Sequence, residues 1–391
     1  MIHKQAVNFQ TFHPKRIVLL VCLFVLLSIS HSLKASVRTN LYGHIIQINY
    51  EHAPIQLSSI TNEVEANARL KAIEATKLAS VVEQLDQYSM KFGMDDLAYV
   101  LMTQKFCKSV YGTEENANLL QFALLKKKGY EVLFGYDSGE TTVYAVLGFK
   151  ILNGTYAVYK GIEYTDISFV KNLEPCEEHL LESKGQGRSI MINENRPPFF
   201  NALSEPFHFY FEFEGSLHFF GGQINKSLVE YYRDLPDIEF GQVYLNYQMS
   251  ASAQQAIIGQ LKNAIGGMFQ SKQIDFLLSF TQNALPYKKD NEQLGKEKFS
   301  FPEEVLANGY GDCEDKSVLF AYLAKEVLQL PSIALLYLSQ NHLNVAVALS
   351  QGNGYNFIYN QTKYLVCEPS GAGFSPGDNI YDLNKASIIS W

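Results

Sequence analysis

The chain has 391 residues, more than one ordinary domain usually contains, and this length predicts two or three domains. Hydrophobic residues make up 47% of it and charged residues 18%, which excludes an intrinsically disordered chain. The net charge is −8 and no basic stripe occurs. These features argue against nucleic acid or an anionic membrane as a partner.

The N-terminus has the layout of a secretory signal peptide. Lys4, Lys15 and Arg16 precede an apolar run at 17–27, and small and polar residues follow up to Ala35. The apolar run is shorter than the roughly 20 residues that a bilayer core requires. We therefore predict that residues 1–35 are removed, leaving a periplasmic or secreted chain without an integral membrane segment. Its net charge would fall from −8 to −12, because the removed part carries four basic and no acidic residues.

The next part of the chain predicts a mixed α/β domain over residues 36–182. Residues 41–57 alternate like a strand pair, and 62–110 have the apolar spacing of helices. A further helix is expected at 116–128, where three lysines and then Gly129 form a stop signal. Four strands are expected after it, at 130–136, 141–149, 156–159 and 163–169.

A linker and a β-rich middle region are predicted next, over residues 183–252. Residues 183–198 are polar and rich in Gly, Asn and Pro, as linkers are. Aromatic segments then predict strands at 207–213, 217–220 and 241–248.

The last domain is predicted to span residues 253–391. Helical patterns begin at residue 253 and recur at 274–283 and 313–328, with a charged loop at 286–297. Pro331 ends the last of these helices, and strands are expected at 332–338, 342–349, 355–359 and 363–368. The sequence as a whole predicts an α+β protein.

Cys313 is the candidate nucleophile because it stands at the first turn of a largely apolar helix. Asp312 is placed to cap that helix, and Asp315 to act as the far member of a capping box. The backbone N–H groups and dipole of a helix start favour the thiolate, whereas the neighbouring acidic side chains oppose it. His342 begins one predicted strand and Glu368 ends another, so neighbouring strands can bring both to the thiol. Cys, His and carboxylate together make an activated nucleophile.

The run PEEVLANGYGDCEDKSVLFAYL and the later Cys367-Glu368-Pro369-Ser370 resemble the core motifs of the transglutaminase-like superfamily. The resemblance covers about residues 270–375 and is closest to exported proteins of bacterial type. Glu368 stands where the family commonly has Asp, and Leu343 stands where it often has an aromatic residue. The resemblance implies a papain-like core of a helix against an antiparallel sheet, with Cys313, His342 and Glu368 as the triad. It also implies a second oxyanion donor, for which Gln282 is the candidate.

The activity that the resemblance implies is that of a cysteine peptidase or amidase acting on a peptide or protein amide. A protein-crosslinking transglutaminase and a non-catalytic binding or scaffold module are the alternatives. A lone cysteine at a helix start is more often packing than catalysis, so the hypothesis depends on the three residues together. No P-loop, HExxH, paired CxxC or GxSxG motif occurs, and we expect neither a metal nor an organic cofactor.

A weak internal likeness links the two ends of the chain. The stretch NANLLQFALLKKKGYEV echoes SVLFAYLAKEVLQLPSIALL some 200 residues later. The overlay places Glu115 near the position of Cys313 and Glu140 near that of His342. The first domain would then be a degenerate copy without nucleophile or base; a chance likeness is the alternative. The sequence also leaves open a disulfide between Cys107 and Cys176.

Overall fold

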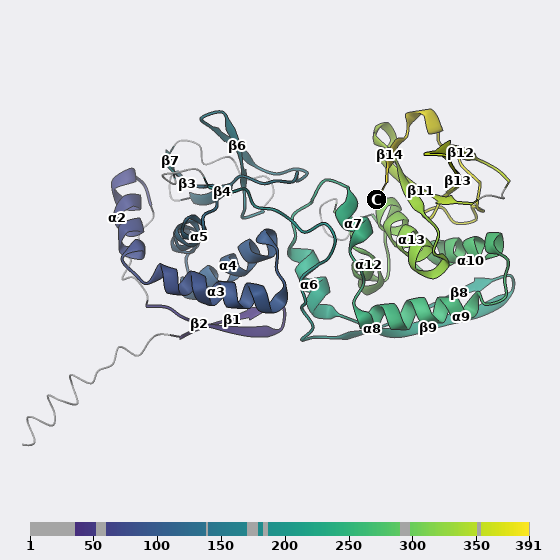
Figure 1. Cartoon of the computed structure of the whole chain (residues 1–391), viewed down its shortest axis with the longest axis horizontal. Helices are drawn as coiled ribbons and strands as arrows, with labels where there is room; N and C mark the ends of the chain where they lie inside the picture. The colour runs from purple at the N-terminus through teal and green to yellow at the C-terminus, as the bar shows by residue number, and fades with distance from the viewer. Residues whose placement is uncertain are drawn as a thin grey trace, which may run out of the picture.

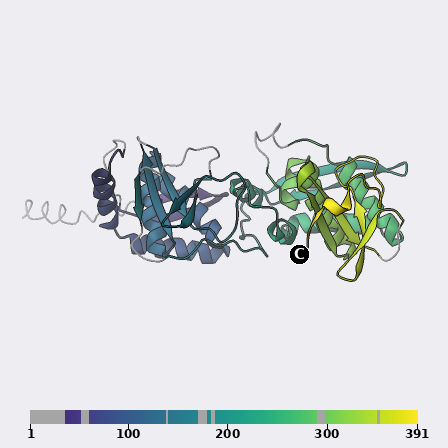
Figure 2. The same ribbon diagram turned by 90° about the horizontal axis from the view of Figure 1, so that it is seen from above.

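The computed structural model describes residues 36–51, 60–137, 140–169, 179–182, 187–289, 298–349 and 353–390. The protein is elongated and has two halves, with α6 (Lys226–Asp234) and α7 (Gln242–Asn246) near their junction (Figure 1). Figure 2 shows the same halves side by side from above. The predicted signal peptide lies outside the described residues. Among those described, no helix combines the length and apolar character needed to cross a membrane.

The N-terminal half begins with a hairpin of β1 (Ser36–Leu41) and β2 (His44–Asn49). Tyr42 and Gly43 close it with φ of 51° and 84°, the left-handed backbone that glycine adopts most easily. The pair predicted at 41–57 therefore starts earlier in the chain, and its last part lies outside the described residues. The predicted helical stretch forms α2 (Glu63–Glu74), α3 (Leu78–Phe92) and α4 (Asp96–Val110).

Helix α5 (Glu114–Lys128) ends where the sequence predicts, at Gly129 in the left-handed conformation. It packs against an antiparallel sheet of order β5-β6-β4-β3-β7. The strands of this sheet are β3 (Val132–Asp137), β4 (Glu140–Ala145), β5 (Tyr156–Tyr159), β6 (Ile162–Asp166) and β7 (His179–Glu182). The N-terminal half is therefore mixed α and β, as predicted. Cys107 is a buried free thiol in α4, and Cys176 lies outside the described residues.

The middle region is only partly β. A long hairpin of β8 (Glu205–Phe213) and β9 (Ser216–Ile224) confirms the first two predicted strands. The strand predicted at 241–248 is wrong: this segment contains the short helix α7. An apolar run as short as Val243-Tyr244-Leu245, all buried, does not distinguish a strand from a buried helical turn.

The β8–β9 hairpin packs with the C-terminal half rather than forming a unit of its own. Its inward phenylalanines meet α10 (Gln270–Asn283), and the Phe211 ring lies 5.2 Å from Phe276 and 5.6 Å from Phe280. These are edge contacts, which aromatic rings favour over face-to-face stacking. The predicted boundary at residue 253 thus falls inside a packed unit.

The C-terminal half has a second five-stranded antiparallel sheet, of order β12-β13-β11-β10-β14. Its strands are β10 (Ser332–Tyr337), β11 (His342–Ala348), β12 (Asn356–Tyr359), β13 (Thr362–Cys367) and β14 (Ser387–Ile389). Helix α13 (Cys313–Leu328) packs on β10 and β11. The other helical segments are α8 (Ala251–Ala253), η1 (Gln254–Ile258), α9 (Gly259–Ala264), α10 and α12 (Pro302–Asn308). Mixed helix and sheet confirm the α+β class.

The two sheets have the same strand order, and in both a helix directly precedes the first strand of the sheet. Glu140 begins β4 opposite the last residue of β3, as His342 begins β11 opposite the last residue of β10. Glu114, one residue before the one predicted, begins α5 as Cys313 begins α13. This common order supports the predicted repeat, in which acidic residues would occupy the positions of the thiol and the imidazole.

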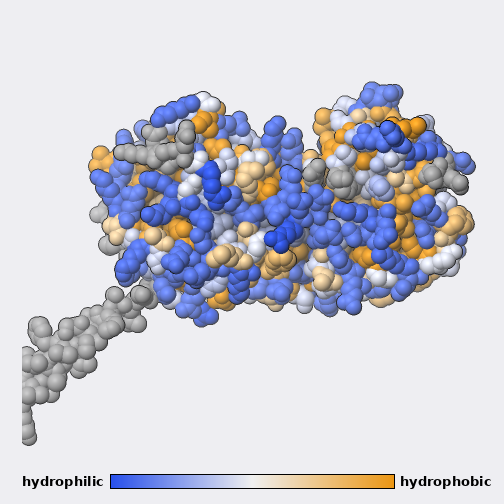
Figure 3. All heavy atoms as spheres, viewed as in Figure 1, coloured by the Kyte–Doolittle hydropathy of each residue, from blue (hydrophilic) through white to orange (hydrophobic). Residues whose placement is uncertain are grey.

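The surface seen in Figure 3 is mixed over both halves. Hydrophobic residues are interrupted by hydrophilic ones across this face, as on most soluble domains. Exposed aromatic residues nevertheless occur on the outer face of the β8–β9 hairpin, where Tyr210 and Phe219 each expose 67% of their surface.

Candidate functional site

The position of Cys313 depends on a sharp reversal between α12 and α13. Helix α12 begins at Pro302, and the Glu304 side chain caps its first turn by accepting from the Phe301 N–H at 3.3 Å. The helix ends at Gly309, whose φ is 70°. The Gly311 N–H then donates to the Pro286 carbonyl at 3.2 Å. A Cβ on Gly311 would lie 2.8 Å from the Cβ of Asp315, so only glycine fits. The chain is thereby turned so that α13 starts at the thiol.

The predicted capping of α13 is only half right. Asp312 occupies the N-cap position, but its side chain makes no capping hydrogen bond. Asp315 points into the protein, where its Oδ1 accepts from the Ser300 N–H at 2.8 Å. Asp315 therefore ties α13 to the segment before α12 instead of closing a capping box.

His342 and Glu368 meet as the sequence predicts. The Nε2 atom of His342 lies 2.7 Å from Oε2 of Glu368, and both side chains are buried. Val345 of β11 is opposite Cys367 of β13, so the next residue, Glu368, lies diagonally across from His342. The other oxygen of Glu368 accepts from the Ser370 N–H at 3.1 Å and from its hydroxyl at 2.6 Å. The carboxylate is thus fixed on both sides and can orient the imidazole.

Cys313 lies beside the same strand. Helix α13 is held to β11 by the Ser317 hydroxyl, which donates to the Leu343 carbonyl at 2.8 Å. The Cys313 sulfur lies 3.9 Å from the carbonyl oxygen of Asn341, the residue before His342. Because Glu368 engages Nε2 of His342, Nδ1 is the ring nitrogen left for the thiol. The structure therefore places Cys313 of α13 against the start of β11, where His342 stands, and brings His342 into direct contact with Glu368 at the end of β13.

The thiol itself is not activated in this arrangement. Burial, followed by the negative charge and hydrogen bond of Glu314, raises the pKa of Cys313 well above its ordinary value, and the Leu343 N–H opposes this. The sulfur lies 2.8 Å from Oε2 of Glu314, to which it donates. These effects outweigh the influence of the helix start. The resting group is a thiol, and His342 must accept its proton during attack.

We expect Glu314→Gln to make Cys313 more reactive. Removal of one negative charge beside the sulfur lowers the thiol pKa by on the order of one unit, and thus speeds alkylation at pH 7.5 about tenfold. The rate of carbamidomethylation at Cys313 measures this directly by peptide mass spectrometry.

Glu326→Gln is the matched control, because Glu326 lies thirteen residues further along α13, about 20 Å away. It should leave the rate unchanged. Equal rates for Glu314→Gln and the unaltered protein would contradict the role assigned to Glu314.

Gln282 does not present a free donor to the site. Its side-chain amide donates to the carbonyls of Glu368 at 2.9 Å and Phe374 at 3.0 Å, which commits both protons. The side chain therefore supports the segment that carries Glu368. A role as oxyanion donor, predicted for Gln282, would require the amide to leave these two carbonyls.

Two further residues of the site were not found from the sequence. The Tyr381 ring stacks on His342, with centroids 4.1 Å apart and planes 19° apart. Lys316, three residues after Cys313, is buried. Tyr381 carries no sequence signal, because its position depends on how the last part of the chain folds back over β10 and β11. The spacing of Lys316 from Cys313 was a usable signal, since residues i and i+3 share a helix face.

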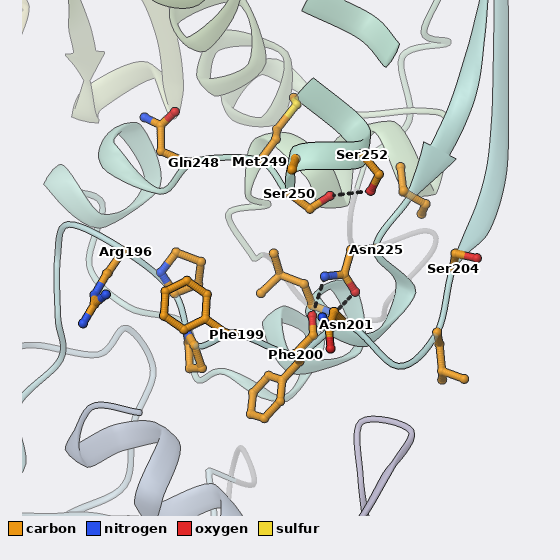
Figure 4. A pocket seen from close by; sticks show the side chains of 16 residues that line it. Arg196, Phe199, Phe200, Asn201, Ser204, Asn225, Gln248, Met249, Ser250 and Ser252 are labelled. Carbon is orange, nitrogen blue, oxygen red and sulfur yellow. Dashed lines mark hydrogen bonds between the residues drawn. The ribbon is translucent and has the colours of Figure 1, made fainter. Parts of the chain in front are cut away.

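A pocket of about 470 Å³ lies apart from the triad, at the junction of the two halves (Figure 4). It is lined by the connecting residues 196–201, by 203–204, by Ile224, Asn225 and Leu228, and by 248–252. One wall reaches α12, because the Ser250 hydroxyl donates to Oε1 of Glu303 at 2.7 Å. None of the triad residues lines this pocket. No cluster of three or more metal-ligating side chains occurs among the residues that the structure describes.

Comparisons of the chain with protein-family models, with curated proteins and with solved structures found no match.

Proposed function

We propose that the C-terminal half is a transglutaminase-like cysteine hydrolase that cleaves an amide bond of a peptide or protein. The observation that carries this proposal is the convergence of Cys313, His342 and Glu368 at one point of the fold. These residues lie on three separate elements, yet the sulfur approaches the residue before His342, and His342 is 2.7 Å from Glu368. A buried helix whose first residue is the thiol, against an antiparallel sheet, supports a papain-like core.

The chemistry follows from these roles. As the Cys313 sulfur attacks the amide carbonyl, its proton passes to Nδ1 of His342, and Glu368 stabilises the imidazolium that forms. The imidazolium then gives the proton to the leaving amine, and a thioester on Cys313 remains. Water, deprotonated by His342, hydrolyses the thioester and restores the thiol. The backbone N–H of Cys313 at the helix start is available to the oxyanion.

A specific observation favours the alternative of a non-catalytic binding module. The thiol donates to Glu314, and burial raises its pKa, so the resting site holds a protonated sulfur. A protein that kept the fold for binding alone would tolerate such a thiol. The export of the chain remains part of the proposal for either role, because the basic and apolar N-terminus supports it equally.

The experiment compares the purified protein with Cys313→Ala on a mixed library of peptides, read by mass spectrometry. Cleavage by the unaltered protein and none by Cys313→Ala is the expected result. A fluorescent primary amine added to the same reaction reports crosslinking chemistry, since a transglutaminase joins it to the acyl group. Absence of both products, together with a Cys313 that resists iodoacetamide up to pH 10, would leave only the binding module.

A further inference from the structure

Lys316 is an unusual side chain to find inside this site. It exposes 1% of its surface, although lysines are almost never fully buried unless they are paired. Its Nζ donates to the backbone carbonyl of Gln282 at 3.1 Å. Within the described part of the chain, no carboxylate lies at ion-pair distance from this ammonium. A single neutral carbonyl is a poor replacement for the water that the ammonium has lost.

Lys316 is nevertheless connected to the triad. Gln282 accepts from Lys316 through its backbone and donates through its side chain to the carbonyl of Glu368. Glu368 in turn binds His342. Hydrogen bonds through Gln282 therefore link the nucleophile helix to the backbone of Glu368, the residue whose carboxylate binds His342, and Lys316 is the lysine at the start of this link.

The charges of the site show what the ammonium offsets. Asp312 and Glu314 flank the thiol, Asp315 follows on the same helix, and Glu368 lies beyond Gln282, with His342 as the other titratable group. The negative charge of Asp275 on α10 contributes to raising the pKa of Cys367, whereas the charge that acts on the pKa of Lys316 is that of Glu368. Burial lowers the pKa of Lys316 to about 8, and the negative charge of Glu368 opposes this decrease. The ammonium and the Glu368 carboxylate are thus electrostatically coupled without touching.

We propose that Lys316 is a positioning residue of the site, whose buried positive charge offsets the acidic groups around the thiol and holds the Glu368 segment in place. This inference rests on the proposed function, because it assigns Lys316 to the same triad. A buried lysine kept for stability alone would instead form an ion pair with a carboxylate. Lys298 provides that contrast: it is equally buried, but its ammonium lies 3.1 Å from Glu304.

The first measurement separates a functional from a structural lysine. Lys316→Met keeps an unbranched side chain only one atom shorter and removes the charge. Since the folded protein lowers the pKa of Lys316 from its ordinary 10.5 to about 8, the charged form destabilises the fold below pH 8. Lys316→Met should therefore unfold at a higher urea concentration than the unaltered protein at pH 7. This difference should shrink between pH 8 and pH 10.5, where the unfolded lysine also loses its proton. Lys298→Met should unfold earlier than the unaltered protein.

The second measurement reports the charge at the thiol. Carbamidomethylation of Cys313 should be about tenfold slower in Lys316→Met at pH 7, the effect of one unit in the thiol pKa. The two rates should converge above about pH 9, because the unaltered Lys316 has then lost its own charge. A merely structural change would give a ratio that does not depend on pH.

Three outcomes would overturn the proposal. These are equal alkylation rates at pH 7, a rate ratio that persists at pH 10, and a Lys316→Met protein that is less stable than the unaltered one or does not fold. Alkylation requires no turnover. A protein that cleaves no peptide but shows the expected pH dependence would therefore contradict the proposed function and not the role of Lys316.

Discussion

Glu368→Gln is expected to lower the rate of peptide cleavage by about 10³- to 10⁴-fold while the protein remains folded. The glutamine has the shape of the glutamate, and its oxygen can still accept from Ser370. It carries no charge, however, and cannot stabilise the imidazolium that forms when His342 takes the thiol proton. The loss should appear in kcat rather than in KM, because the interaction develops only in the transition state.

Steady-state cleavage of the best peptide from the library measures this prediction, with circular dichroism to verify the fold. His342→Ala alone and in combination with Glu368→Gln provides the internal test. Since the two residues act as a unit, the double variant should lose little more activity than His342→Ala alone. Additive losses would mean that Glu368 acts through something other than His342.

Lys298→Met is expected to destabilise the protein by about 3–5 kcal/mol, the usual effect of breaking a buried ion pair from one side. The Lys298 ammonium lies 3.1 Å from Oε1 of Glu304 and also donates to the Tyr232 carbonyl at 2.7 Å. Both charged side chains are 3% exposed. Without the lysine, Glu304 would be a buried and uncompensated carboxylate at the helix that precedes Cys313.

Urea unfolding followed by fluorescence gives the free energy of unfolding for this variant. The double variant Lys298→Met/Glu304→Leu serves as the comparison for Lys298→Met, because it removes both charges and replaces them with apolar groups of similar size. It should regain most of the lost stability. A loss below about 1 kcal/mol in Lys298→Met would show that water reaches the pair.

Much of the fold was predictable because local patterns are strong in this chain. Helix α5 carries its own stop signal at Gly129, and α13 begins at the predicted residue because two glycines and Asp312 prevent an earlier start. The strand predicted at 241–248 is wrong for the opposite reason, because the local pattern there is weak. Residues there are buried on several sides, so the periodicity that separates helix from strand is lost.

The candidate site was likewise predictable from the sequence only in part. The sequence by itself was enough to nominate Cys313, His342 and Glu368 as candidates and to predict the elements that carry them, since each stands at the end of a helix or strand with a local signal. The tertiary structure decided what surrounds those residues. It committed the Gln282 amide to two carbonyls, stacked Tyr381 on His342, turned Asp315 inward and buried Lys316. These are contacts between segments distant in the sequence, and the free energy of burial that shifts the pKa values of Cys313 and Lys316 exists only once those segments have packed together.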